Sequence, residues 1–89
     1  MKGFNDLEFK THSFHNGVIS RLYFNNGYGV SVVKHEYSYG GKEGFFELAI
    51  LNSNGELVYD TPITNDVLGW LTDERVSEIM KEVQLLKAE

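Results

Sequence analysis

Three histidines are the residues of this chain best suited to acid–base or metal chemistry, because imidazole titrates near neutral pH and binds metal ions. His12 and His15 lie three residues apart, and on an extended segment that spacing points them to opposite faces. We therefore expect no metal site and no cofactor. His35 with Glu36 or Glu43 is the basis of a weaker alternative, a small hydrolase or transferase. A histidine at a sheet edge is the simpler interpretation, so we expect no catalytic residues.

The glycine-rich segment 40–44 (GGKEG) has a superficial similarity to a phosphate-binding loop. That motif requires Ser or Thr after the lysine and a helix behind it, whereas here Glu follows and a strand is expected. Two tyrosines precede the glycines, and tyrosine with glycine is a composition favoured in binding loops. We expect a binding loop formed by Tyr37, Tyr39, Gly40, Gly41, Lys42 and Glu43. The alternative is that the tyrosines fold back onto the edge of the sheet.

The negative charge is concentrated in the second half of the chain. Residues 1–44 hold five Lys or Arg and four Asp or Glu, whereas residues 45–89 hold three and nine. Nucleic-acid binding depends mainly on cations that neutralise phosphates, so this distribution argues against a DNA or RNA partner. An acidic surface that includes Asp73, Glu74 and Glu78 is a second candidate site, suited to a basic protein surface.

Length and composition limit the number of domains, the source of stability and the expected location of the chain. The chain has 89 residues, of which 42% are hydrophobic and none is cysteine. These values predict a single domain over 1–89, held together by packing alone, with residues 1–6 as a flexible N-terminus. No run of apolar residues is long enough for a membrane span, which makes the cytoplasm the expected location and a membrane partner unexpected.

Asn-Gly turns organise the expected sheet. Segments 18–24 and 28–36 are rich in β-branched and aromatic residues and flank Asn26-Gly27. A two-residue type I′ turn there would place Tyr23 opposite Val30 and Arg21 opposite Val32. The apolar segment 45–51 and the segment 56–60 are expected to form a second hairpin, with Leu51 opposite Val58. With a leading strand over 7–14, the prediction is a five-stranded antiparallel meander.

The chain after Pro62 is expected to be helical. A short helical turn is expected to begin at Thr64 or Asn65 and to end at Gly69. Trp70 is expected to be buried, with an exposed anchor as the alternative. Thr72 can cap a longer helix whose apolar residues recur every three or four positions: Val76, Ile79, Met80, Val83 and Leu86. The fold class is therefore α+β, an antiparallel sheet packed against one C-terminal amphipathic helix.

Three strings, Asn26–Val33, Tyr39–Leu51 and Tyr59–Leu71, resemble a family of small uncharacterised proteins encoded by tailed bacteriophages. The resemblance covers residues 9–86 and implies a setting, the cytoplasm of an infected bacterium, without site residues. It favours a non-enzymatic protein that binds a host or phage protein and is itself a monomer or weak homodimer. The alternative is a structural or accessory domain that self-associates through a sheet edge.

Overall fold

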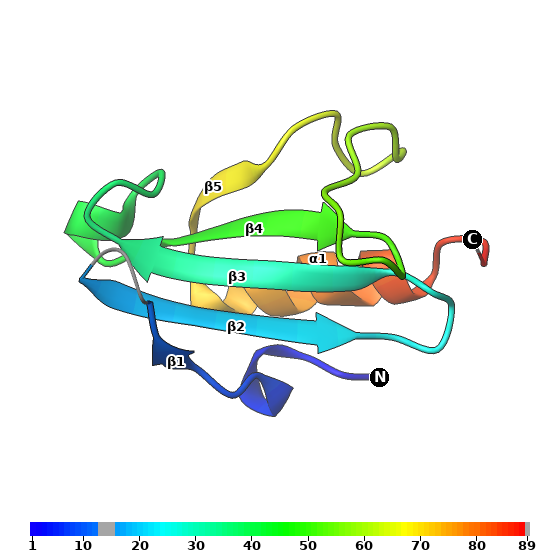
Figure 1. Ribbon diagram of the computed structural model, residues 1–89, viewed down its shortest axis with the longest axis horizontal. Coiled ribbons are helices and arrows are strands. Elements are labelled where there is room, and N and C mark those ends of the chain that lie inside the picture. Colours follow the sequence, from blue (N-terminus) through cyan, green and yellow to red (C-terminus); the bar gives the residue numbers. More distant parts are fainter. Residues whose placement is uncertain (13–15, 89) are drawn as a thin grey trace.

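An antiparallel sheet of five strands packs one face against a C-terminal helix, as Figure 1 shows for a computed structural model that describes residues 1–12 and 16–88. The strands lie in the order β1-β2-β3-β4-β5, each beside its neighbour in sequence. This arrangement confirms the predicted α+β class. The elements are η1 (Phe4–Asp6), β1 (Lys10–Thr11), β2 (Gly17–Tyr23), β3 (Gly29–His35), η2 (Gly41–Glu43), β4 (Phe46–Leu51), β5 (Leu68–Leu71) and α1 (Asp73–Gln84).

The core lies between α1 and the even-numbered residues of the central strands. Val30, Val32, Leu48 and Ile50 face the helix and are buried. The helix contributes the predicted apolar stripe, because Val76, Ile79, Met80 and Val83 are also buried. Thr72 caps α1 as predicted, since its Oγ1 accepts a hydrogen bond from the main-chain N–H of Arg75 at 3.1 Å.

The N-terminal segment, expected to be flexible over residues 1–6, is held against α1. The main-chain N–H of Phe4 donates to Ser77 Oγ at 2.8 Å. Gln84 Nε2 donates to the Lys2 carbonyl at 2.8 Å, and the Lys2 N–H donates to Gln84 Oε1 at 3.0 Å. Phe4 also packs its ring on Phe9 and Phe46. These contacts join both ends of the chain, and the sequence pattern did not indicate them.

The Asn26-Gly27 turn is one residue longer than predicted. The N–H of Phe24 donates to the Tyr28 carbonyl at 2.7 Å, so the loop is Asn25-Asn26-Gly27 with Gly27 at φ 92°. A type I′ turn needs positive φ at both central residues, but Asn26 has negative φ. The register therefore places Tyr23 opposite Gly29 and Arg21 opposite Ser31, so the predicted pairs are wrong by one residue.

The second hairpin is almost absent. Segment 56–60 forms one isolated bridge, Leu51 with Leu57, instead of a strand, and the predicted pair Leu51–Val58 is wrong. The fifth strand is β5, which lies in the region predicted to be a helical turn before a buried tryptophan. Residues 52–67 thus form the long connection that brings β5 alongside β4 (Figure 1). At the other edge, β1 is shorter than the predicted strand, whose residues 13–14 lie outside the described part of the chain.

Candidate functional site

The β3–β4 connection is folded on itself by hydrogen bonds. Ser38 is buried, and its Oγ both accepts from the His35 N–H at 3.0 Å and donates to the His35 carbonyl at 2.9 Å. The N–H of Phe45 donates to the Gly40 carbonyl at 2.9 Å, which closes the segment around η2. The N–H of Tyr39 donates to Glu47 Oε1 at 3.0 Å. Hydrogen bonds from both strands therefore position the tyrosines of this connection.

The same connection is joined to β5. The main-chain N–H of Trp70 donates to the Tyr39 carbonyl at 3.1 Å. Gly69 allows this approach, because a Cβ there would overlap the Cβ of Tyr39. The contact places two aromatic residues, 31 positions apart in sequence, on adjoining main-chain segments.

Trp70 lies in a β-bulge with an unusual main-chain conformation. Phe46 pairs with Leu71 and Leu48 pairs with Leu68, so β5 has one extra residue over this stretch. Trp70 has φ 55°, and it is the one non-glycine residue with positive φ in the described part of the chain. A left-handed conformation costs an ordinary residue about 1–2 kcal/mol. Bulges redirect side chains, and strained residues of this kind concentrate at functional sites.

The bulge leaves the indole in solvent. Trp70 is 59% exposed and Tyr39 is 60% exposed, so the predicted burial of Trp70 is wrong. The rings of Phe45 and Trp70 have centroids 5.8 Å apart. We define the aromatic patch as Tyr39, Phe45 and Trp70. Tyr37, two residues before Tyr39, is 71% exposed on the same connection. The tyrosines thus do not fold back into a buried position against the sheet edge.

The other residues of the predicted binding loop divide into two kinds. Gly40 is buried, and a Cβ there would lie 2.9 Å from both Phe45 Cβ and the Trp70 ring, so its absent side chain makes room for the patch. Gly41 is half-buried against the turn at His35. Lys42 and Glu43 are exposed in η2, between Tyr39 and Phe45 in the chain. Contact with a partner remains a prediction for all of these residues.

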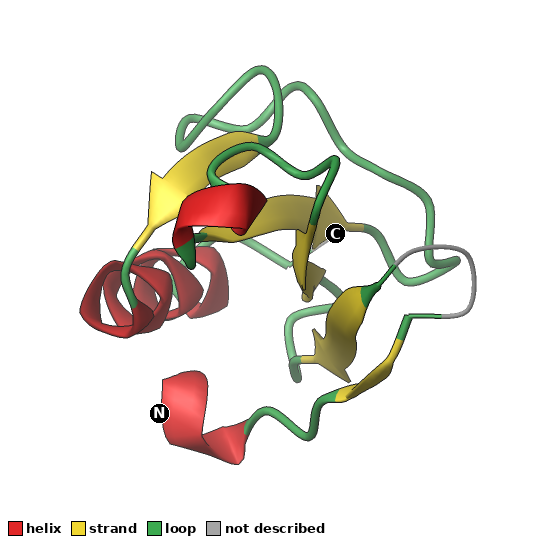
Figure 2. Ribbon diagram, turned by 90° about the vertical axis from the view of Figure 1, so that its left-hand side faces the viewer, coloured by secondary structure: helices red, strands yellow, loops and turns green. Residues whose placement is uncertain are grey.

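The predicted acidic surface lies at the first turns of α1, close in sequence to Trp70. Figure 2 shows the short helix η2 and α1 on the same side of the molecule. Asp73 and Glu74 are exposed, and Asp73 Oδ1 accepts from the Glu74 N–H at 2.9 Å. Glu78 differs from them, because Arg75 Nη1 lies 3.1 Å from its Oε1 and forms an ion pair. Asp73 and Glu74 line a pocket with Phe4, Asn5 and Ser77 and are close to Trp70 only in sequence, while Glu78 has a cation beside it.

The histidine that lies beside His12 in the structure is His35, whereas the pair considered in the sequence was His12 with His15. His12 and His35 have ring centroids 4.8 Å apart, because the N–H of His12 donates to the Gly17 carbonyl and Gly17 pairs with His35. His35 Nδ1 accepts from the Tyr37 N–H at 3.1 Å, which supports the tyrosine connection. His15 lies outside the described residues. Among the described residues, no three His, Asp or Glu side chains gather in a way that suits a metal ion.

Sequence reasoning missed Phe45, and for Trp70 it favoured burial over an exposed anchor. Trp70 follows an apolar stretch, which is typical of a buried residue, and only the bulge in β5 turns it outward. The one available signal was Gly69, since a glycine inside a strand often marks a bulge or a close main-chain approach.

The structure contains no helix, within the residues it describes, that is long and apolar enough to cross a membrane.

Comparisons with known proteins return no relative for this chain. No family model, no curated protein and no solved structure matches it. The resemblance to bacteriophage proteins therefore remains an expectation from sequence motifs, and function must be argued from the aromatic patch itself.

Proposed function

We propose that this chain is a non-enzymatic binding protein that engages another protein through the aromatic patch. The observation that carries the proposal is Trp70, a strained and exposed tryptophan fixed to Tyr39 by a main-chain hydrogen bond. Tryptophan and tyrosine are enriched among the residues that dominate binding energy at protein interfaces. A ring positioned in advance loses little conformational entropy when a partner covers it.

Charged residues close to Trp70 in the chain indicate the chemistry of the partner. Asp73 and Glu74 follow Trp70 closely in the chain and are exposed, while the whole chain has a net charge of −5. Charges at the rim of an interface act mainly on the rate and specificity of encounter. The partner surface that fits has an apolar centre to cover the rings and basic residues beside it.

The proposed biological setting is the one that the sequence resemblance implies. In that setting the partner is a host or phage protein in the cytoplasm of an infected bacterium. The motifs Asn26–Val33, Tyr39–Leu51 and Tyr59–Leu71 support this setting. The second and third of them also contain the three residues of the aromatic patch.

The test compares partner capture by wild-type protein and two patch variants, Trp70→Ala and Tyr39→Ala. Proteins captured from bacterial lysates by the wild type, but lost with both variants, are purified and titrated. Because Trp70 is the only tryptophan, its fluorescence reports the interface directly, and a blue shift on binding is expected. Tyr39→Ala should weaken the purified complex by about thirtyfold, the effect of losing roughly 2 kcal/mol at an interface hot spot.

Two controls decide the outcome. Tyr23→Ala removes an exposed tyrosine from β2 and should leave capture unchanged. Melting curves must show that the patch variants remain folded. The proposal is wrong if the folded variants capture the same proteins as the wild type, or if Trp70 fluorescence does not respond to any captured partner.

The alternative, self-association through a sheet edge, has less support from the two edges. At β5 the N–H of Trp70 is already bonded to the β3–β4 connection. At β2 an antiparallel pairing of two copies centred on Arg21 would bring the two guanidinium groups together, and like charges directly opposite are destabilising. Size-exclusion chromatography with light scattering separates the alternatives, since a concentration-independent dimer would favour self-association.

A further inference from the structure

The edge of β2 is open beyond the point where β1 leaves it. The N–H of Phe24 donates to the Tyr28 carbonyl, so Phe24, Leu22 and Ser20 direct their main-chain groups toward β3. Arg21 and Tyr23 consequently direct their main-chain N–H and carbonyl groups away from β3, toward the free edge of β2. In the described residues, β1 pairs with β2 at Ile19 and Val18 and goes no further along it. Continuing the register would bring Glu8 opposite Arg21, but no such pair forms.

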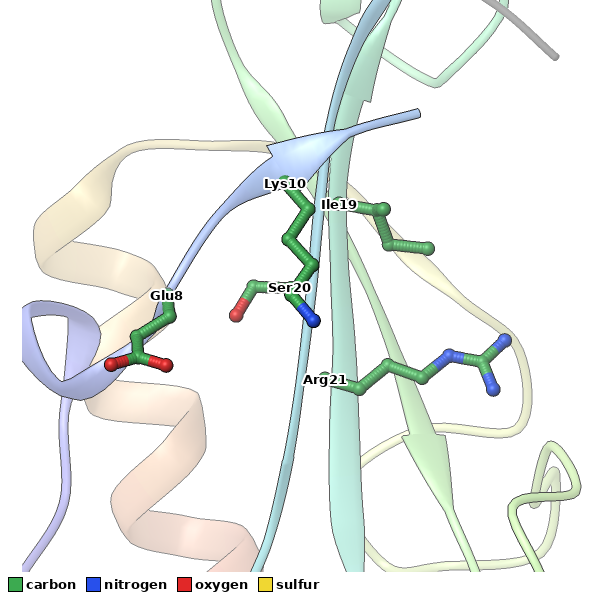
Figure 3. A pocket seen from close by; sticks show the side chains of 5 residues that line it. All are labelled: Glu8, Lys10, Ile19, Ser20 and Arg21. Carbon is green, nitrogen blue, oxygen red and sulfur yellow. The ribbon is translucent and has the colours of Figure 1, made fainter. Parts of the chain in front are cut away.

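A groove occupies the space left by this divergence. It has a volume of about 340 Å3 and is lined by Glu8, Lys10, Ile19, Ser20 and Arg21. Figure 3 shows Glu8 and Ser20 on the side of β2 toward the N-terminal segment and Ile19 and Arg21 projecting the other way, with Lys10 extending from β1 toward β2. The groove therefore gives access to the open main-chain edge between two sets of side chains.

The floor of the groove holds an unused polar atom. Ser20 is 4% exposed, and its Oγ has no hydrogen-bond partner in the part of the chain that the structure describes. Buried polar atoms are normally hydrogen-bonded, and an exception needs an explanation. A ligand that enters the groove and bonds this hydroxyl supplies one.

We propose that this groove binds a short extended peptide, which adds to the sheet as an antiparallel strand beside β2. An extended main chain is the group that matches the outward N–H and carbonyl of Arg21 and Tyr23. The peptide residue opposite Arg21 has its side chain on the Arg21 face, which favours Asp or Glu there. The adjacent peptide residues lie opposite Ser20 and Leu22, which favours a polar side chain at the first position and an apolar side chain at the second. The ligand class is thus an extended peptide with an acidic residue between a polar and an apolar residue, at a site separate from the aromatic patch.

The occupant that we propose is a peptide of another protein. A second copy of this chain is a poorer match, because pairing centred on Arg21 would place two Arg21 side chains opposite each other. A free carboxylate ligand is a poorer match, because Glu8 repels it on one side of the groove and only a peptide main chain uses the open strand edge.

The experiment selects binders from a display library of random octapeptides on the full-length chain and locates them by amide hydrogen exchange. In the free protein, the Arg21 and Tyr23 amides should exchange rapidly, whereas those of Ser20 and Leu22 are protected by β3. A selected peptide should slow exchange at Arg21 at least tenfold. N-methylation of the peptide residue that pairs with Arg21 should abolish that protection, because it removes a main-chain donor without changing the side chains.

Two substitutions provide a second measurement. Arg21→Glu should weaken the selected acidic peptides at least tenfold and shift selection toward basic peptides, whereas the matched surface change Lys87→Glu should not. Ser20→Ala should keep the fold and weaken binding severalfold. Trp70→Ala should leave this binding intact, so the result is independent of the proposed function. The proposal is overturned if no peptide is selected, if peptides bind without slowing exchange at Arg21, or if only Trp70→Ala removes them.

Discussion

Leu71 and Trp70 are neighbours in β5, yet they serve opposite purposes. Leu71 is buried with the α1 residues in the core, while Trp70 stands 59% exposed. Successive strand residues point to opposite faces, and the extra residue of the bulge lets Leu68 and Leu71 both face the core while Trp70 stays outside. A large apolar residue therefore stabilises this fold where the helix covers it, as at Leu71. On the face that the helix does not cover, a large apolar residue such as Trp70 is available for binding.

Ile79→Ala tests the covered side of this comparison and has the largest expected effect. Ile79 is fully buried in α1 against the sheet. Removing its side chain should lower the free energy of unfolding by about 2–4 kcal/mol through lost burial and an unfilled cavity. Denaturant unfolding measures the change. Leu85→Ala, at a 72% exposed position, is the control and should cost less than about 0.5 kcal/mol.

Asn26→Ala tests how the hairpin secures the end of the same helix. Asn26 Nδ2 donates to the Val83 carbonyl at 2.8 Å and to the Leu86 carbonyl at 3.1 Å. Its Oδ1 accepts from the Tyr28 N–H at 3.1 Å. Losing these bonds should cost about 2 kcal/mol, because part-buried carbonyls lose their donor. Thermal melting measures the loss, and Asn25→Ala, in the same turn but exposed, should show a much smaller one.

Trp70→Gly compared with Trp70→Ala tests the uncovered side. Both changes remove the indole, but glycine adopts positive φ without strain, so the glycine variant should be more stable by about 1 kcal/mol. The order should reverse at Tyr23, an exposed position within β2, where alanine is favoured by about 0.5–1 kcal/mol. Chemical denaturation of the four variants measures both differences. Equal stabilities at position 70 would contradict the left-handed conformation and remove the structural reason for the exposed ring.

Ser20→Ala has the smallest expected effect and sharpens the contrast between core and groove. Its hydroxyl is buried with no hydrogen-bond partner among residues 1–12 and 16–88, so removing it should leave stability unchanged or raise it by up to about 1 kcal/mol. A loss above 1 kcal/mol would show that the hydroxyl makes a stabilising bond in the folded protein. Denaturant midpoints of the two proteins provide the measurement.

The candidate site was only partly accessible from the sequence. Tyr37 and Tyr39 could be singled out because tyrosine beside glycine has a recognisable composition, and both are exposed. Phe45 could not be singled out, and the exposure of Trp70 could not be decided, since both depend on which strand lies next to β4. The strand β5 has only four residues, so a one-residue bulge in it cannot be recognised from the alternation of apolar and polar residues in the sequence.

The sequence by itself determined the class of fold, the helix and its cap. A 3.6-residue apolar period and Thr72 before two acids are local features, and α1 needs no distant residue to define its buried face. The tertiary structure decided the hairpin registers, the fifth strand and the exposure of Trp70. Asn-Gly is compatible with two- and three-residue loops, and a shift of one residue exchanges the faces of a strand. Segments 56–60 and 68–71 both pair with β4, the first at Ile50 and Leu51 and the second at Phe46 and Leu48. The placement of β5 rests on packing with α1 and on the Tyr39–Trp70 contact, which join residues far apart in the chain.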